Sequence, residues 1–256
     1  MKKKMWLIFW INVFLSFLVL LFDCISFLKY QNSPEDVLLI FNFCLNVGTW
    51  SNFLLLISQT FNVYCVDYTK QDYLYILKKG VVSAGSICVG CIIFILVISL
   101  FLPLVDPEGS EFQSFVIHYE STKQYKNFFC LTPIIISGHY VLYYVVSLYF
   151  IFLNCLLWSI IGYSVYTVIK NAYISSILTF LVYYLEPYVI ANIVNSLFHI
   201  NLYTTKNFML GNFNFQSSTI GNVTLLTALY FTMIFLLIKL SYFTREYITE
   251  QNRDLS

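Results

Sequence analysis

Hydrophobic residues along this chain gather into six long stretches, and the polar residues lie mostly between them. The stretches cover residues 5–28, 37–60, 81–104, 140–163, 172–190 and 220–241. Each is close to the roughly 20 residues that a helix needs to cross the hydrocarbon core of a bilayer. Alternating segments of about ten residues, which are typical of a membrane β-barrel, are not found. The pattern predicts an all-α polytopic membrane protein, with six transmembrane helices in a single domain over 1–256.

Composition supports a lipid environment. Hydrophobic residues make up 59% of the chain and charged residues 11%, whereas a soluble domain carries about a quarter of its residues as charges. The net charge is only +1, so electrostatics give no reason to expect nucleic acid as a partner. The lipid bilayer is therefore the expected surroundings of most side chains.

The first apolar stretch follows Met1 and three lysines, which is also how a secretory signal begins. The apolar region of a signal peptide has about 7–15 residues and ends at a cleavage site of small residues. The stretch over 5–28 is longer, and it ends in Phe27-Leu28-Lys29. We therefore interpret it as a retained first span.

Lysine and arginine accumulate in the cytoplasmic loops of membrane proteins, so their distribution predicts orientation. Threading the six stretches alternately places ten basic residues on one side: Lys2, Lys3, Lys4, Lys70, Lys78, Lys79, Lys170, Lys239, Arg245 and Arg253. The other four fall on the opposite side: Lys29, Lys123, Lys126 and Lys206. This bias predicts that both termini are cytoplasmic, in a multi-pass protein of the plasma membrane.

This threading assigns each connection to a side. The outer side receives the two longest ones, 105–139 and 191–219. The second of these is itself apolar in places, which predicts a short helix lying in, or dipping back into, the outer leaflet. The inner side receives a compact amphipathic connector over 65–80 and a polar tail over 242–256.

Polar residues inside the first two spans fall on one side of each helix. In the first span, Asn12, Ser16, Asp23 and Ser26 lie within a sector of about 80°. The second span has its own polar side: Asn42, Asn46, Thr49, Asn52, Gln59 and Thr60. Such faces are unfavourable in lipid and should point into the bundle. They would serve either as hydrogen bonds between helices or as the lining of a polar pathway.

Asp23 and Glu186 are the only acidic residues within the predicted spans. An intramembrane carboxylate is what a proton-coupled transporter needs. Each lies toward the outer end of its span, which favours the alternative of a carboxylate that reaches water. Glu186 also precedes Pro187, and a residue before proline is pushed out of helical geometry. The pair predicts a kink or the end of the fifth span.

No catalytic or metal-binding pattern is evident. Cys88 and Cys91 have the spacing of a redox pair, but they lie inside a span among small residues, which favours close helix packing. The histidines 118, 139 and 199 are far apart and form no H-x-x-x-H or H-E-x-x-H site. We expect no enzymatic activity, no metal and no cofactor.

The connector between the second and third spans carries aromatic and charged residues together, among them Tyr68, Lys70, Asp72, Tyr73 and Tyr75. With six spans, both ends inside and a partly apolar outer segment before the last span, this layout resembles the permease subunit of ABC-2-type ABC transporters. The resemblance covers the whole chain at the level of topology.

The resemblance implies an exporter of a peptide or lipophilic substrate, with ATP hydrolysis on a separate ATPase subunit. That subunit would dock on the five connector residues, and a second permease copy or homologue would complete the bundle. The residues expected inside the bundle are Asn12, Asp23, Asn42, Asn46, Asn52, Gln59 and Glu186. Two alternatives remain: an accessory or immunity-type integral membrane protein without transport activity, and an ion-coupled secondary transporter.

Overall fold

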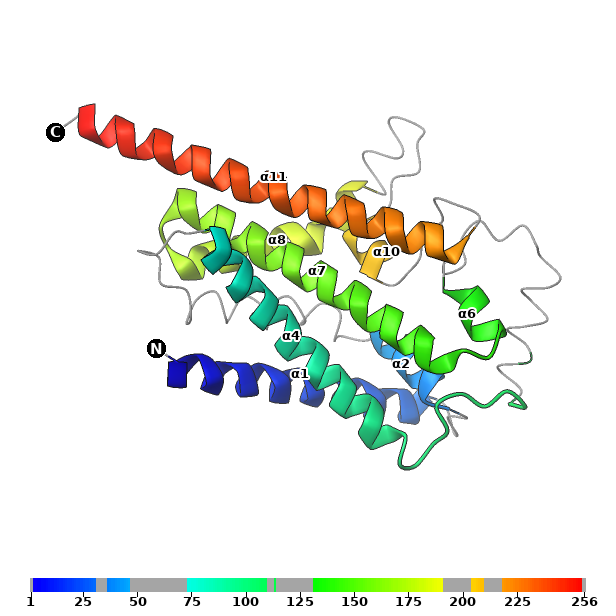
Figure 1. Cartoon of the computed structure of the whole chain (residues 1–256). Helices are drawn as coiled ribbons and strands as arrows, with labels where there is room; N and C mark the ends of the chain where they lie inside the picture. Colours follow the sequence, from blue (N-terminus) through cyan, green and yellow to red (C-terminus); the bar gives the residue numbers. More distant parts are fainter. Residues whose placement is uncertain are drawn as a thin grey trace.

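The computed structural model describes residues 2–30, 36–46, 73–109, 113, 131–190, 204–209 and 218–254. Its helices are α1 Lys2–Tyr30, α2 Val37–Asn46, α4 Tyr73–Ile98, α6 Thr132–Ile136, α7 Tyr140–Ile169, α8 Ala172–Tyr188, α10 Thr205–Met209 and α11 Thr219–Asp254 (Figure 1). No strand occurs in these ranges, which confirms the all-α prediction for them.

Four helices are long and apolar enough to cross a membrane: Met5–Lys29, Leu74–Ile98, Tyr140–Ile169 and Thr219–Thr244. They support the prediction of a membrane protein. The fifth predicted stretch forms α8, which has 17 residues. Of the second, the structure describes only the ten residues of α2. The count of six spans therefore stays a prediction.

Helices α1 and α4 run in the same direction, side by side. Lys79 Nζ, near the start of α4, lies 3.0 Å from Met5 Sδ near the start of α1. Further along both helices, the Ser16 hydroxyl donates to the Ile87 carbonyl at 3.5 Å. Helix α7 runs antiparallel to α4, since Gly80 packs on Leu156 while the later Cys88 donates to the carbonyl of the earlier Leu148.

Helix α11 runs parallel to α7, as two polar contacts show. The Tyr149 and Thr227 hydroxyls are 3.1 Å apart, and Ser241 donates to the Ser164 hydroxyl at 2.6 Å. The starts of α1 and α4 and the ends of α7 and α11 therefore meet at one end of the bundle, where both chain termini lie (Figure 1). Which side of the membrane this end faces stays a prediction.

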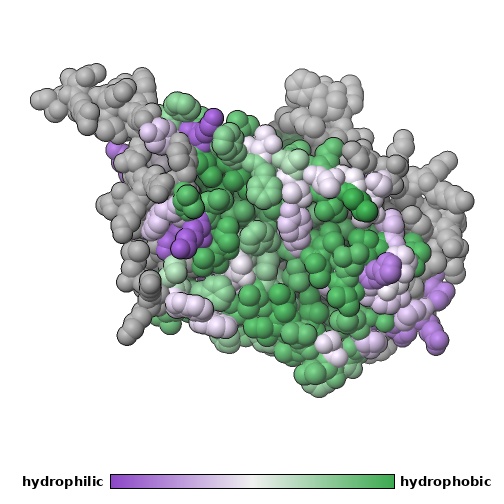
Figure 2. Space-filling model, in the orientation of Figure 1, coloured by the Kyte–Doolittle hydropathy of each residue, from purple (hydrophilic) through white to green (hydrophobic). Residues whose placement is uncertain are grey.

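The outside of the bundle is apolar in its middle. Hydrophobic side chains cover the central part of the visible face, and hydrophilic ones gather toward its two ends (Figure 2). Large apolar residues are exposed on the first and last helices, including Phe14 and Phe22 on α1 and Phe231 and Phe235 on α11. In water this exposure would be unfavourable, whereas a bilayer would cover it.

The third apolar stretch was expected to continue to 104, but α4 ends at Ile98. Pro103 has no N–H to continue a helix, and the free carbonyls nearby accept bonds from other elements. The Val37 N–H donates to Pro103 O at 3.0 Å, and the Tyr144 hydroxyl donates to Leu104 O at 2.9 Å. The last apolar residues of the stretch thus form a turn that packs on α2 and α7.

Asp36 fixes the start of α2 against this turn. Its Oδ1 accepts the Leu39 N–H at 2.8 Å, as an N-cap residue does. Its Oδ2 accepts the Asp106 N–H at 3.0 Å. Asp36 is buried, so one carboxylate satisfies backbone donors of two segments that are far apart in the chain.

Two segments that were predicted as separate inner connections form parts of long helices in the structure. From Tyr73 onward, the connector predicted over 65–80 forms the first turns of α4, and 65–72 lie outside the described residues. The polar tail predicted from 242 continues α11 as far as Asp254. Hydropathy locates where lipid ends, but a helix can extend into water beyond that point.

Helices α7 and α8 form a tight antiparallel hairpin. Lys170 closes α7 in the left-handed conformation, with φ of 56°. Asn171 then caps α8 by accepting the N–H groups of Tyr173 and Ile174 at 3.0 and 3.2 Å. This turn fixes the depth at which each residue of α8 meets α7.

Candidate functional site

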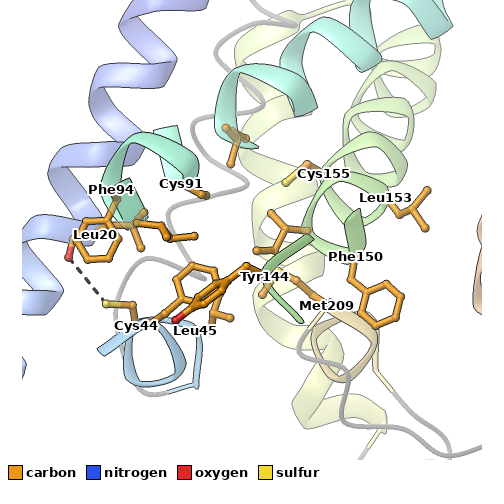
Figure 3. Close-up of a cluster of buried hydrophobic side chains, with 14 of the residues drawn as sticks. Leu20, Cys44, Leu45, Cys91, Phe94, Tyr144, Phe150, Leu153, Cys155 and Met209 are labelled. Atoms are coloured by element: carbon orange, nitrogen blue, oxygen red, sulfur yellow. Dashed lines mark hydrogen bonds between the residues drawn. The ribbon is translucent and has the colours of Figure 1, made fainter. Parts of the chain in front are cut away.

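Helix α10 lies at the middle of the bundle. Met209, at its end, is 2% exposed, and the Asn154 side-chain amide donates to Met209 Sδ at 3.4 Å. Asn154 is at the midpoint of α7, a helix of 30 residues. Figure 3 shows Met209 in the same buried cluster as Phe150, Leu153 and Cys155 of α7.

Helix α11 contacts α10 at the same depth. The Tyr230 hydroxyl donates to Asn154 Oδ1 at 3.3 Å, and the rings of Phe208 and Tyr230 meet edge to face with centroids 6.3 Å apart. Tyr230 is close to the middle of the apolar part of α11, Thr219–Thr244. Because α7 and α11 both meet α10 at their midpoints, α10 lies at the centre of the bundle.

Glu186 of α8 holds the start of α10. Its Oε1 accepts the Thr205 N–H at 2.8 Å, and its Oε2 accepts the Thr205 hydroxyl at 2.5 Å. Thr205 is thus bound through both its backbone and its side chain. Carboxylates prefer this type of partner, since backbone N–H and hydroxyl donors form strong bonds to an ionised acceptor.

Trp158 completes the contact from α7. Its indole N–H donates to the Thr205 hydroxyl at 3.2 Å, so this hydroxyl accepts from Trp158 and donates to Glu186. The Trp158 ring lies edge to face with that of Tyr183, at 5.2 Å between centroids. Both aromatic residues are buried, and the Tyr183 ring holds the Trp158 indole in place.

Two further donors of α10 are satisfied locally. The Thr204 hydroxyl accepts the Asn207 N–H at 3.1 Å, and the Thr204 carbonyl accepts the Phe208 N–H at 3.1 Å. Irregular backbone at membrane depth is tolerated only where its polar groups have such partners.

The depth of Glu186 follows from the short hairpin. Glu186 is near the end of α8, about 20 Å along a helix that begins beside the end of α7. Helix α7 is about 45 Å long, so this distance reaches only its middle. The sequence suggested a carboxylate near the outer interface, whereas the structure places it beside Trp158 and α10.

Polar residues of α1 are buried, and Ser16 faces α4. Asn12 and Ser16 are 0% exposed, and Asp23 is 2% exposed. Leu20, one turn before Asp23, accepts the Cys44 thiol of α2 at 3.8 Å (Figure 3). Asn42 and Asn46 lie on α2, and Asn52 and Gln59 lie outside the described residues.

The expected docking residues are only partly visible. Tyr73 begins α4, and Tyr75 lies one half-turn further, with the Lys79 ammonium 5.3 Å from its ring centroid. The other three, Tyr68, Lys70 and Asp72, lie outside the described residues. The structure places Tyr75 at the bundle end that contains the start of α1.

Cys88 and Cys91 are free thiols in the structure. Small residues beside them are buried, including Ser83, Ala84 and Ser86. Gly90 touches α1 so closely that an added Cβ would lie 2.8 Å from Val13 O. These contacts agree with the helix-packing interpretation.

Sequence reasoning did not single out Asn154, Trp158, Thr205 or Tyr230. Asn154 is one polar residue in an apolar span, a signal that could have been noted. Thr205 carries none, because only tertiary packing brings it to a carboxylate 19 residues away in the chain.

Comparisons with known proteins assign no relatives: no protein-family model, no curated protein and no solved structure matches this chain. Across the described ranges, no group of three or more His, Cys, Asp or Glu residues could hold a metal ion. The geometry of the bundle itself is therefore the basis for any functional conclusion.

Proposed function

We propose that this protein is the membrane-spanning permease subunit of an ABC-type exporter, which moves a peptide or lipophilic substrate using a separate ATPase subunit. The observation that carries the proposal is the short helix α10, which packs on α7 at its midpoint beside Tyr230 of α11. Transporters commonly place broken helices at the midplane, where they contact the substrate. A bundle that only anchored a protein would have no need of such an element.

The proposed topology has six spans with both termini in the cytoplasm. The basic residues support it, since Lys78 and Lys79 at the start of α4, Lys170 after α7 and Arg245 in α11 belong to the same bundle end as the chain termini. In this orientation α11 begins at the outer side of the plasma membrane, which is the release side of an exporter.

In the proposed mechanism, the ATPase subunit docks around Tyr75 and the preceding connector. Nucleotide binding would favour one conformation of the docked ATPase pair, and the continuous helix α4 would pass that change into the bundle, as a shift between inward-facing and outward-facing states. A second permease copy or homologue would supply the other half of the pathway.

A second candidate is ion-coupled secondary transport, which the position of Glu186 favours. A carboxylate at mid-depth is the group that such a transporter needs. The two candidates differ in their energy source, so they separate experimentally.

The test is purification of the tagged full chain from its native membranes in a mild detergent. The proposal predicts that a P-loop ATPase co-purifies in stoichiometric amount, and that the complex hydrolyses ATP. Alanine substitution of Tyr75 should release the ATPase, while substitution of Tyr188, exposed on α8, should not. A chain that purifies alone, and whose transport survives ATP depletion but stops with a protonophore, would support the second candidate instead.

A further inference from the structure

Glu186 is an acidic residue at mid-depth in the bundle. Its two oxygens accept bonds from Thr205, and within the described ranges these are the bonds that the carboxyl makes. An intramembrane carboxylate is expensive unless it is paired or takes up a proton. Proton uptake is therefore one way in which this carboxyl can be neutralised.

Within the described ranges, the titratable groups near Glu186 are few. Tyr183 lies on the same helix, Tyr230 on α11 and Lys206 on α10, and Cys155 lies near both tyrosines. The tyrosines and the cysteine are neutral at physiological pH. Lys206 adjoins Thr205 but forms no ion pair with Glu186 among the described residues.

We propose that Glu186 is a proton-binding site, and that its ionised form holds α10 in the centre of the bundle. In the ionised state both oxygens accept from Thr205. When a proton from water adds to Oε2, the carboxyl becomes a donor there, and the Thr205 hydroxyl can no longer donate to that oxygen in the same geometry. The bond from the Thr205 N–H to Oε1 also loses its charge assistance.

Trp158 fixes the orientation of the Thr205 hydroxyl. Its indole N–H donates to the Thr205 hydroxyl, which leaves that hydroxyl oriented toward Glu186 in the ionised state. The protonated carboxyl would have to compete with the indole for the same oxygen of Thr205. Protonation of Glu186 thus weakens the attachment of α10 to α8, and release of α10 favours proton uptake by linkage.

The inference concerns the docking of α10 and does not depend on the energy source of transport. Its test is hydrogen exchange of the purified full chain in lipid nanodiscs, followed by mass spectrometry from about pH 4 to about pH 9, a range that spans carboxyl pKa values. Rates are corrected for the intrinsic pH dependence of exchange. The reporter is the peptide that contains 204–209, and peptides of α7 report whether the bundle stays folded.

In the wild type, the proposal predicts that protection of 204–209 falls by about fivefold at the acidic end while α7 stays protected, since a bond to a charged group is worth about 1 kcal/mol more than a neutral one. Glu186→Gln should show low protection at every pH. Thr205→Ser, which keeps both donors, should behave as the wild type, and Thr205→Val, which keeps only the backbone donor, should show a smaller pH dependence.

Wild-type protection of 204–209 that does not change with pH would overturn the proposal, even if the variants failed to fold. An unchanged pH dependence in a folded Glu186→Gln protein would also overturn it, because another group would then be responsible. Neither outcome bears on the presence of an ATPase partner, so this test and that of the proposed function fail separately.

Discussion

Gly90 of α4 lies directly against Ser16 of α1: a Cβ atom added to Gly90 would stand 2.7 Å from the Cβ of Ser16. Real carbon atoms do not approach this closely without a shift. The Val13 carbonyl, 2.8 Å from the same position, is backbone and cannot rotate away. The absence of a side chain at Gly90 is what lets two parallel helices touch here.

Gly90→Ala is therefore expected to destabilise the protein by about 1–3 kcal/mol, the usual effect of overpacking a tight interface. The measurement is the free energy of unfolding in mixed micelles. Gly85→Ala is the matched control, since nothing lies within 4 Å of a Cβ added to Gly85. It should gain up to about 1 kcal/mol, because alanine favours helix over glycine. Equal effects of both substitutions would refute the close contact of α1 and α4.

A substitution at Lys170, the left-handed residue after α7, is expected to stabilise the protein. Lys170 has φ of 56°, a conformation that costs a residue with a Cβ about 1 kcal/mol or more. Lys170→Gly should raise the free energy of unfolding by up to about 1 kcal/mol. Lys170→Ala removes the same charge but keeps the strain, so it should show no gain. If both variants gain equally, the charge is responsible and not the backbone.

The next residue tests the cap of α8. Asn171 accepts two backbone N–H groups, and loss of such a cap costs about 1 kcal/mol. Asn171→Ala should lower the thermal unfolding midpoint, and Asn171→Asp, which keeps the acceptor, should not. An unchanged midpoint in Asn171→Ala would mean that the hairpin does not depend on this cap.

The sequence predicted much of the framework, because hydrophobic length is a strong signal in membrane proteins. The apolar stretches at 5–28, 81–104, 140–163 and 220–241 correspond to α1, α4, α7 and α11. Hydropathy could not locate their ends: α4 begins at Tyr73 and α11 continues to Asp254. Helix continuity depends on the backbone, whereas hydropathy reports only where lipid begins.

Less of the candidate site could be predicted from the sequence. The polar sector of α1 with Asn12 and Ser16 followed from helical spacing, and both residues are buried. Helix α10 has only five residues and includes threonine, lysine and asparagine, which is typical of a surface loop. Its central position comes from contacts with Glu186, Trp158 and Asn154, which no local pattern encodes.

The contact between Asn154 and Tyr230 is open to a double-mutant cycle. Asn154→Leu and Tyr230→Phe each remove one side of a buried bond of 3.3 Å. Interhelical bonds in membranes contribute about 0.6 kcal/mol on average. The cycle should give a coupling of this size in the free energy of unfolding. A coupling near zero would show that α7 and α11 are not joined at this depth.

The position of α10 at the centre of the membrane is the claim on which the account depends, and spin-label depth tests it directly. A nitroxide is attached at Asn207→Cys in a background without native cysteines, and its relative accessibility to oxygen and to a water-soluble nickel chelate is measured in nanodiscs. Labels at Phe231, exposed mid-way along α11, and at Glu108, exposed after α4, provide the lipid and aqueous references. The account predicts that the Asn207 label matches the depth of Phe231. A label that matches Glu108 would contradict it.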